Sequence, residues 1–275
     1  MQPVPVPRRS IPQTFAELKE RGRISLMPFI PAGYPDLATT IACLPALESA
    51  GANLVEIGIP FSDPIADGPT IQASYNVALA RKIKVADVLA AVASARPRVS
   101  LPLVSMVSYS IVYRQGVEVF VARAKEAGFD GLILPDLPPP EAQRVCDLVR
   151  AGGLETILLV APTTTPPRRK QIASLSSGFI YYLSVSGITG ERDQLPSDLA
   201  QNVRAVKELT DRPVCVGFGI SKPRHVAQLS GIADGAIVGS AYVKRMHEHL
   251  SDGPDALAKA VGEYTRQLLS ELPAR

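Results

Sequence analysis

Short apolar runs alternate along the chain with longer stretches in which apolar and charged residues recur at helical spacing. The runs are rich in aliphatic and β-branched residues, and most end near Gly or Pro. Such nearly continuous apolar runs are typical of parallel strands covered on both faces. We expect strands at residues 26–30, 54–59, 101–107, 131–134, 156–160, 179–183, 214–217 and 236–238.

The intervening stretches predict helices, and most strands therefore begin about 25–30 residues apart, the length of a βα unit. Gly follows four of these stretches, at positions 51, 128, 152–153 and 178, where a helix commonly ends with a residue in the left-handed conformation. The expected helices are residues 37–50, 85–95, 116–127, 140–151, 168–176, 197–209, 223–229 and 254–272.

Eight alternating units favour an α/β fold of the single (β/α)8 TIM-barrel type over a doubly wound sheet. No change of composition marks an internal boundary. We therefore expect one barrel domain over residues 12–275, preceded by a flexible Pro-rich tail over residues 1–11. The interval between the second and third strands is nearly twice the usual one, and residues 61–82 are expected to form an enlarged loop. Because loops after barrel strands build active sites, this loop indicates function.

Glu56 lies in the second expected strand, and its place in the alternation predicts that it points into the barrel. Val55, Ile57 and Ile59 share the face that packs on the helices, so Leu54, Glu56 and Gly58 share the inner face. An inward carboxylate is costly unless it is paired or used, and burial raises its pKa toward the range useful for acid–base catalysis. The alternative is a structural ion pair, although the other strand runs offer few basic partners.

Asp63 and Asp67 follow in the enlarged loop. Asp63-Pro64 and Asp67-Gly68-Pro69 are also good turn sequences, so a pair of structural Asx turns is the alternative. Two Asp residues just beyond an inward Glu fit a carboxylate pair, one for proton transfer and one for orientation.

Glycine-rich loops follow the last three strands, at residues 186–190, 217–221 and 239–240. In barrels, backbone N–H groups after the last two strands often bind a phosphate at a helix N-terminus. Ser221 is expected to cap a helix with Pro223 in its first turn. These loops predict a phosphate ligand, with tight turns as the alternative. Lys222 stands where a dinucleotide-binding fingerprint needs its third Gly.

Other candidate groups give weaker signals. His225 is expected on a helix surface, and His247 and His249 do not share a helix face, which argues against a metal pair. No metal motif is present, and no lysine is placed at a strand end for a Schiff base. Tyr181 and Tyr182 alternate faces in the sixth strand, so one of them should point inward.

Composition adds constraints on compartment and partners. The formal net charge is +3, and 46% of residues are hydrophobic, so the chain is globular and no nucleic-acid partner is indicated. Three separated cysteines without a C-x-x-C pattern fit a reducing cytosol. No apolar run is long enough for a membrane span, and the N-terminal tail lacks a signal-peptide core. We expect a cytoplasmic protein without membrane contact.

These motifs resemble those of the tryptophan synthase alpha subunit family over nearly the whole chain, from about Phe15 to the final helix. The most specific is LVEIGIPFSDPIADGPTIQ at residues 54–72. Shorter matches are MPFIPAG at 27–33, LPDLP at 134–138, APTTT at 161–165, SVSGITG at 184–190 and GFGIS at 217–221.

The resemblance implies a metal-free retro-aldol cleavage of indole-3-glycerol phosphate to indole and glyceraldehyde 3-phosphate. By residue, it implies that Glu56 is the acid–base group, that Asp67 holds the indole N–H, and that Asp63 supports the partner interface. It places the phosphate at Gly190, Gly219, Gly239 and Ser240, and it matches Phe29, Tyr181, Thr189 and Phe218 to the pocket. It also implies that residues 188–194 close over the substrate.

The resemblance further implies a beta subunit partner in an α2β2 assembly, with pyridoxal phosphate (PLP) only in that partner and no cofactor in this chain. One stretch departs from the family pattern. Residues 108–111 read Ser-Tyr-Ser-Ile, where many members have Tyr-Tyr-Asn-Pro in a loop that contacts the beta subunit. The alternatives are a stand-alone lyase, another phosphate-binding barrel with a strand-end Lys, and a non-catalytic barrel that only activates a partner.

Overall fold

The computed structural model describes residues 7–63, 67–184, 194–217 and 219–272. Within them, parallel strands close into a barrel in chain order, and β8 pairs back onto β1. The predicted (β/α)8 barrel is confirmed. The strands are β1 (Ser25–Pro31), β2 (Val55–Gly58), β3 (Leu103–Met106), β4 (Gly131–Ile133), β5 (Glu155–Val160), β6 (Ile180–Leu183), β7 (Val214–Gly217) and β8 (Gly235–Val238).

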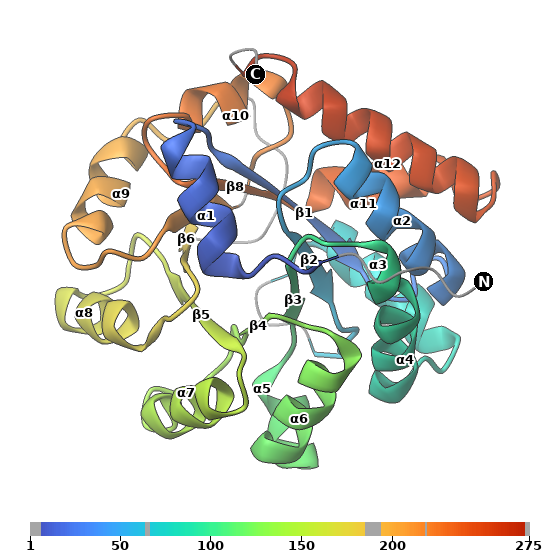
Figure 1. Cartoon of the computed structure of the whole chain (residues 1–275), viewed down its shortest axis with the longest axis horizontal. Helices are drawn as coiled ribbons and strands as arrows, with labels where there is room; N and C mark the ends of the chain where they lie inside the picture. Colours follow the sequence, from blue (N-terminus) through green and yellow to red (C-terminus); the bar gives the residue numbers. More distant parts are fainter. Residues whose placement is uncertain (1–6, 64–66, 185–193, 218, 273–275) are drawn as a thin grey trace.

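Apart from the first helix, which lies across one end of the barrel, the helices surround it broadly in chain order, as the colour sequence around the ring in Figure 1 shows. Every predicted helix is present, with ends that differ from the expected ones by less than one turn. The helices are α1 (Ile11–Glu20), α2 (Leu37–Ser49), α3 (Pro69–Ala80), α4 (Val85–Ala95), α5 (Tyr109–Gln115), α6 (Val117–Ala127), α7 (Ala142–Ala151), α8 (Pro166–Leu175), α9 (Leu199–Lys207), α10 (Pro223–Leu229), α11 (Ser240–Glu248) and α12 (Pro254–Leu269). None of the described helices has the length and apolar character needed to cross a bilayer.

Two apolar clusters, one inside the barrel and one under the helices, follow from the alternation of side chains along each strand. Leu54, just before β2, packs in the interior cluster, whereas Val55 and Ile57 of β2 pack in the shell cluster. In β6, Tyr181 lies in the interior cluster and Tyr182 in the shell. The predicted inner face of the second strand and the single inward Tyr are both confirmed.

Helix α1 closes the end of the barrel opposite the loops that follow the strands. Ser10 and Gln13 form a capping box at its start, which satisfies N–H groups that a helix end leaves open. Ile11 and Phe15 enter the interior cluster, and the Phe15 ring lies 5.9 Å from that of Phe179. This helix was not predicted, because its apolar face packs into a barrel mouth that the local sequence does not reveal.

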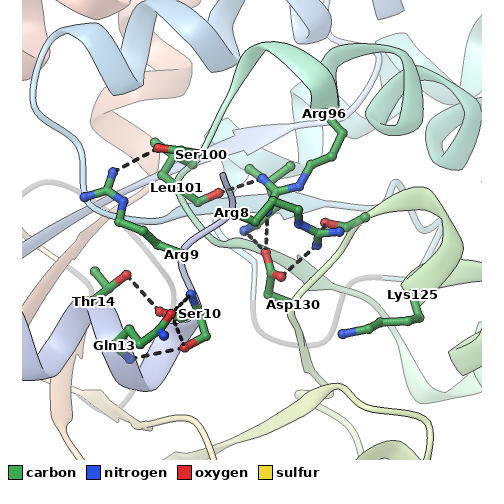
Figure 2. Close-up of polar contacts among 12 residues, drawn as sticks. Arg8, Arg9, Ser10, Gln13, Thr14, Arg96, Ser100, Leu101, Lys125 and Asp130 are labelled. Carbon is green, nitrogen blue, oxygen red and sulfur yellow. Dashed lines mark hydrogen bonds and ion pairs between the residues drawn. The ribbon is translucent and has the colours of Figure 1, made fainter. Parts of the chain in front are cut away.

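Ion pairs join the N-terminal segment to the same end of the barrel (Figure 2). The Asp130 carboxylate accepts from Arg8 at 2.8 Å, from the buried Arg96 at 3.0 Å and from the Leu103 backbone N–H at 3.0 Å. Arg9 lies 3.5 Å from a carboxylate oxygen of Glu48. The described end of the expected N-terminal tail is therefore attached to strands and helices that are distant in sequence.

The expectation of one continuous loop over residues 61–82 is wrong, because residues 69–80 form α3. Pro69 opens this helix, and Ile71, Ser74, Tyr75 and Ala78 are buried along one face, which is helical spacing. The Asp-, Pro- and Gly-rich composition before residue 69 obscured that spacing. Helix α5 was also missed, since seven residues give too short a pattern to recognise.

The predicted left-handed Gly positions are confirmed at Gly51 (φ +105°), Gly128 (φ +98°) and Gly153 (φ +76°). The prediction is wrong at Gly178, which has no positive φ. A methyl group at Gly178 would instead come 3.0 Å from the Glu155 Cβ. There the glycine permits close packing between neighbouring strands rather than a turn.

Candidate active site

Glu56 lies in the middle of β2, beside Phe29 of β1 and Val104 of β3 in the strand register. Its side chain is only 4% exposed, and its Oε1 atom has no hydrogen-bond partner among the described residues. Burial raises the pKa of Glu56 to about 8, and the neighbouring Asp67 charge adds to the shift. Glu56 is therefore a mostly neutral carboxylic acid at pH 7 with an oxygen free to act.

Asp67 lies just before α3, and its charge acts on Glu56. Its side chain is half-buried, and burial raises its pKa to about 6. The Gln72 side-chain amide donates to the Asp67 carbonyl at 2.6 Å, which ties this residue to the first turn of α3. Asp63 is exposed, and its carboxylate accepts from the Ser62 hydroxyl at 2.7 Å. Of the two candidate Asp residues, only Asp67 is linked electrostatically to Glu56.

Aromatic side chains form the walls around the carboxylates. Tyr181 is buried, and the charges of Glu56 and Asp67 raise its pKa in addition to the effect of burial. A methyl group at Gly217 would overlap the Tyr181 ring, and one at Gly58 would come 2.6 Å from the Phe29 ring. Glycines at these two strand ends therefore leave room for the rings. Phe29 and Tyr181 therefore pack against strand-end glycines, and their assignment to the pocket stays a prediction.

Tyr75 is a wall residue that the sequence reasoning missed. It lies on α3, is 3% exposed, and its hydroxyl occupies the position that a methyl group at Gly58 would take. Burial and the charges of Asp67 and Glu56 raise its pKa well above the ordinary value. Recognising the helical spacing after Pro69 would have placed this Tyr on the buried face of a helix.

Of the residues predicted to bind phosphate, Gly219, Gly239 and Ser240 are among the described residues. Gly239 immediately precedes α11, Ser240 is its first residue, and Gly219 has a φ of +79°. A methyl group at Gly239 would lie 3.7 Å from the Phe29 and Ile71 side chains, so the start of α11 borders the pocket. An anion is favoured at such a helix N-terminus. Thr189, Gly190 and Phe218 lie outside the described residues, as do most residues of the expected closing segment 188–194.

Two expectations about α10 are wrong. Lys222, not Ser221, occupies the capping position, and the Ser221 hydroxyl is buried without a hydrogen-bond partner among the described residues. His225 is fully buried rather than on the surface, and its Nδ1 accepts from the Ser221 backbone N–H at 3.3 Å. The amphipathic pattern of α10 was too short to show that its His faces the barrel wall.

The other two histidines contact different partners. His247 Nδ1 lies 3.0 Å from the Tyr34 hydroxyl, and His249 Nδ1 lies 2.8 Å from Asp252. Across the described residues, no three His, Cys, Asp or Glu side chains are grouped as a metal ion would require.

The two carboxylates have different pKa values, and this difference defines what the pocket can do. Near pH 7 the Glu56 carboxyl holds its proton, whereas the Asp67 carboxyl is mostly ionised. A neutral acid beside a carboxylate can donate a proton to a substrate while the carboxylate stabilises the positive charge that results. The border with α11 adds a place for an anionic group.

Comparisons with known proteins point to one family. A family model described as "Tryptophan synthase alpha chain" matches residues 15–270. Proteins of that description from Rhodopirellula baltica and Chloroflexus aurantiacus are each 46% identical to the chain, covering 94% of it and 97% of the relative. A chain of Mycobacterium tuberculosis tryptophan synthase superposes with a TM-score of 0.84 at 36% identity, covering 95% of this chain and 99% of that one. The tryptophan synthase A-subunit from Pyrococcus furiosus gives 0.82 at 38% identity, with coverage of 90% and 98%.

Proposed function

The chain belongs to the tryptophan synthase alpha chain family, and on that premise we propose which of its residues carry out the family's reaction. The chain is a lyase of L-tryptophan biosynthesis that cleaves indole-3-glycerol phosphate to indole and glyceraldehyde 3-phosphate. The observation that carries the assignment of residues is the pairing of a neutral Glu56 with an ionised Asp67 in one pocket.

Glu56 serves as both acid and base. Its carboxyl gives a proton to C3 of the indole ring, which leaves a positive charge on the ring. The resulting carboxylate then accepts the proton of the side-chain hydroxyl next to C3. The bond between C3 and the hydroxyl-bearing carbon breaks, its electrons return to the ring, and the aldehyde forms. The carboxyl ends protonated as it began, so one group with a pKa near neutrality serves both steps.

Asp67 holds the indole N–H and stabilises the ring cation. A carboxylate placed at the nitrogen is worth most when the positive charge appears, so it lowers the barrier more than it strengthens binding. Its raised pKa of about 6 still leaves it mostly ionised at pH 7.

The phosphate group binds at the end of the pocket formed by Gly219, Gly239 and Ser240, together with Gly190. Two of these residues are at the N-terminus of α11, where backbone N–H groups favour an anion. The rings of Phe29 and Tyr181 contact the indole, with Thr189 and Phe218 as further pocket residues. Binding energy from the phosphate holds the indole in place between the two carboxylates.

The test is an assay of indole release from indole-3-glycerol phosphate by purified variants. Glu56→Gln is expected to abolish indole release with the fold retained, and Asp67→Asn to impair it severely. The matched control is Glu17→Gln, since Glu17 lies exposed on α1 at the other end of the barrel. Activity like that of the wild type in Glu56→Gln would refute the assignment.

We infer that the chain works in the cytoplasm as part of an α2β2 assembly and needs no cofactor of its own. Indole would pass to a PLP-dependent beta subunit, with Asp63 supporting the interface. The C-terminal rim of the barrel supports this, because Tyr113 on α5 is 67% exposed and Val119 on α6 is 53% exposed. Tyr113 and Val119 lie on helices that follow one another in the chain, and exposed apolar side chains on adjoining helices are typical of interaction surfaces.

The unusual stretch at residues 108–111 forms the start of α5 beside this surface. The Ser108 hydroxyl and the Tyr109 backbone N–H both donate to the Asp136 carboxylate at 2.6 Å. These bonds fix α5 on the rim without the Asn and Pro that many members have there. Indole release measured with and without a purified beta subunit distinguishes the two roles: strong activation supports a synthase subunit, and full activity alone supports a stand-alone lyase.

A further inference from the structure

Tyr75 lies between the two elements that supply the carboxylates. Helix α3, which carries it, begins two residues after Asp67, and Tyr75 lies on the buried face of that helix. Its hydroxyl abuts Gly58, which is on the same inner face of β2 as Glu56. The Phe29 ring borders the same position, since its atoms lie 2.6 Å from a methyl group built on Gly58. The hydroxyl thus lies in the wall of the pocket.

The surroundings of Tyr75 make its hydroxyl a donor. Burial raises its pKa well above the ordinary value, and the charges of Asp67 and then of Glu56 add to the rise. The phenol therefore keeps its proton throughout the working range.

We propose that Tyr75 is a positioning residue of the lyase site, whose hydroxyl donates a hydrogen bond to the Asp67 carboxylate when indole fills the pocket. The inference rests on the proposed role of Asp67. A hydrogen bond to an ionised carboxylate favours the charged form. It therefore counteracts the effect of burial on Asp67 and keeps the carboxylate ionised and turned toward the ring nitrogen.

The variant Tyr75→Phe removes only the hydroxyl oxygen and leaves the ring in the wall. Loss of the donor is expected to move the acidic limb of the kcat profile upward by about one pH unit, which is the scale of one charge-assisted hydrogen bond. The deficit in kcat is then about tenfold at pH 5 and less than about twofold at pH 7.5. KM is expected to change less than about twofold, because the bond acts on the charge of Asp67 rather than on ground-state binding.

Tyr182→Phe is the matched control. Tyr182 lies on β6, faces the shell, and has a buried hydroxyl without a hydrogen-bond partner among the described residues. The variant Tyr182→Phe also loses a hydroxyl oxygen, but at a site that does not face the carboxylates. We expect its kcat and the acidic limb of its kcat profile to match those of the wild type. A kcat loss in Tyr75→Phe that is equal at every pH would show a role in packing alone and would overturn the inference. So would an unchanged profile.

A measurement without turnover separates this inference from the proposed function. The Asp67 carboxyl signal is followed by NMR in protein that carries ¹³C-labelled Asp and is saturated with indole, with Asp67→Asn identifying the signal. The Asp67 titration is expected to move upward by about one pH unit in Tyr75→Phe and to stay in place in Tyr182→Phe. If the wild type releases no indole from its substrate, the proposed function fails, yet this titration still decides whether Tyr75 acts on Asp67. An identical titration in all three proteins would refute the inference even in an active enzyme.

Discussion

Replacing Glu56 by Gln should stabilise the fold at neutral and alkaline pH while it abolishes activity. The Glu56 carboxyl is buried, and its Oε1 has no hydrogen-bond partner among the described residues. Ionising it inside the barrel is therefore unfavourable. Gln has nearly the same shape and carries no charge at any pH, so the variant removes the ionisation and little else.

The magnitude follows from the pKa of Glu56, which burial raises from 4.5 to about 8. Between these two values the native state holds a proton that the unfolded chain has released, so stability falls as pH rises. The contribution of the neutral carboxyl is complete below pH 4.5 and is lost as pH rises through about 8. The loss amounts to about 3 kcal/mol at pH 7 and about 5 kcal/mol above pH 8. Glu56→Gln should be more stable than the wild type by about these amounts.

Urea unfolding followed by circular dichroism from pH 4.5 to pH 9 measures this difference in the free energy of unfolding. The curves of wild type and Glu56→Gln should nearly meet at pH 4.5 and diverge as pH rises. The exposed Glu17→Gln variant should follow the wild type throughout. A difference between wild type and Glu56→Gln that stays constant with pH would refute the reasoning, since it would mean that folding does not raise the pKa of Glu56.

Three further predictions concern the pocket and the opposite end of the barrel. The wild-type rate should show a bell-shaped pH profile with limbs near pH 6 and pH 8, because Asp67 must be ionised and Glu56 must be neutral. Steady-state rates of indole release measure this profile, and a flat profile would contradict the prediction. Gly58→Ala should lower thermal stability by about 1–3 kcal/mol, since the added methyl group overlaps the Tyr75 hydroxyl. An unchanged unfolding midpoint would show that the Tyr75 side chain can move aside without cost. Asp130→Ala should cost about 3–5 kcal/mol in urea unfolding because it leaves the buried Arg96 without its carboxylate. Asp147→Ala, which removes an exposed pair, should cost far less than Asp130→Ala, and equal losses in the two variants would refute the argument from burial.

The architecture and the inward Glu were predictable because they depend on short-range patterns. Alternation along a strand decides which side chains face the barrel, and this requires only the neighbours of Glu56 in the chain. The packing of Leu54 inside the barrel and of Val55 outside it confirms that logic. The same local reasoning predicted that either Tyr181 or Tyr182 points inward, and in the structure it is Tyr181.

What the sequence could not supply depends on contacts between distant segments. Helix α1 buries Ile11 and Phe15 only because the barrel mouth accepts them, and no local feature marks that mouth. His225 has a polar side chain on a seven-residue helix, and its burial is set by the strand beneath it. Tyr75 joins the carboxylates through its contact with Gly58, which is 17 positions earlier in the chain. Such contacts require the fold before they can be seen.

Buried charge is compensated at one end of the barrel and left uncompensated at the other, and this difference explains how Glu56 can stay a neutral acid. At the end closed by α1, the Asp130 carboxylate accepts from two Arg side chains and a backbone N–H, so its charge is compensated and supports the fold. In the pocket, Glu56 has an unpaired oxygen and a pKa raised by burial. Pairing Glu56 with an Arg would lower that pKa and remove the neutral acid that the reaction needs. Among the described residues, the paired Asp130 charge therefore lies away from the pocket, and the free energy lost at Glu56 is the consequence of keeping an acid neutral at pH 7.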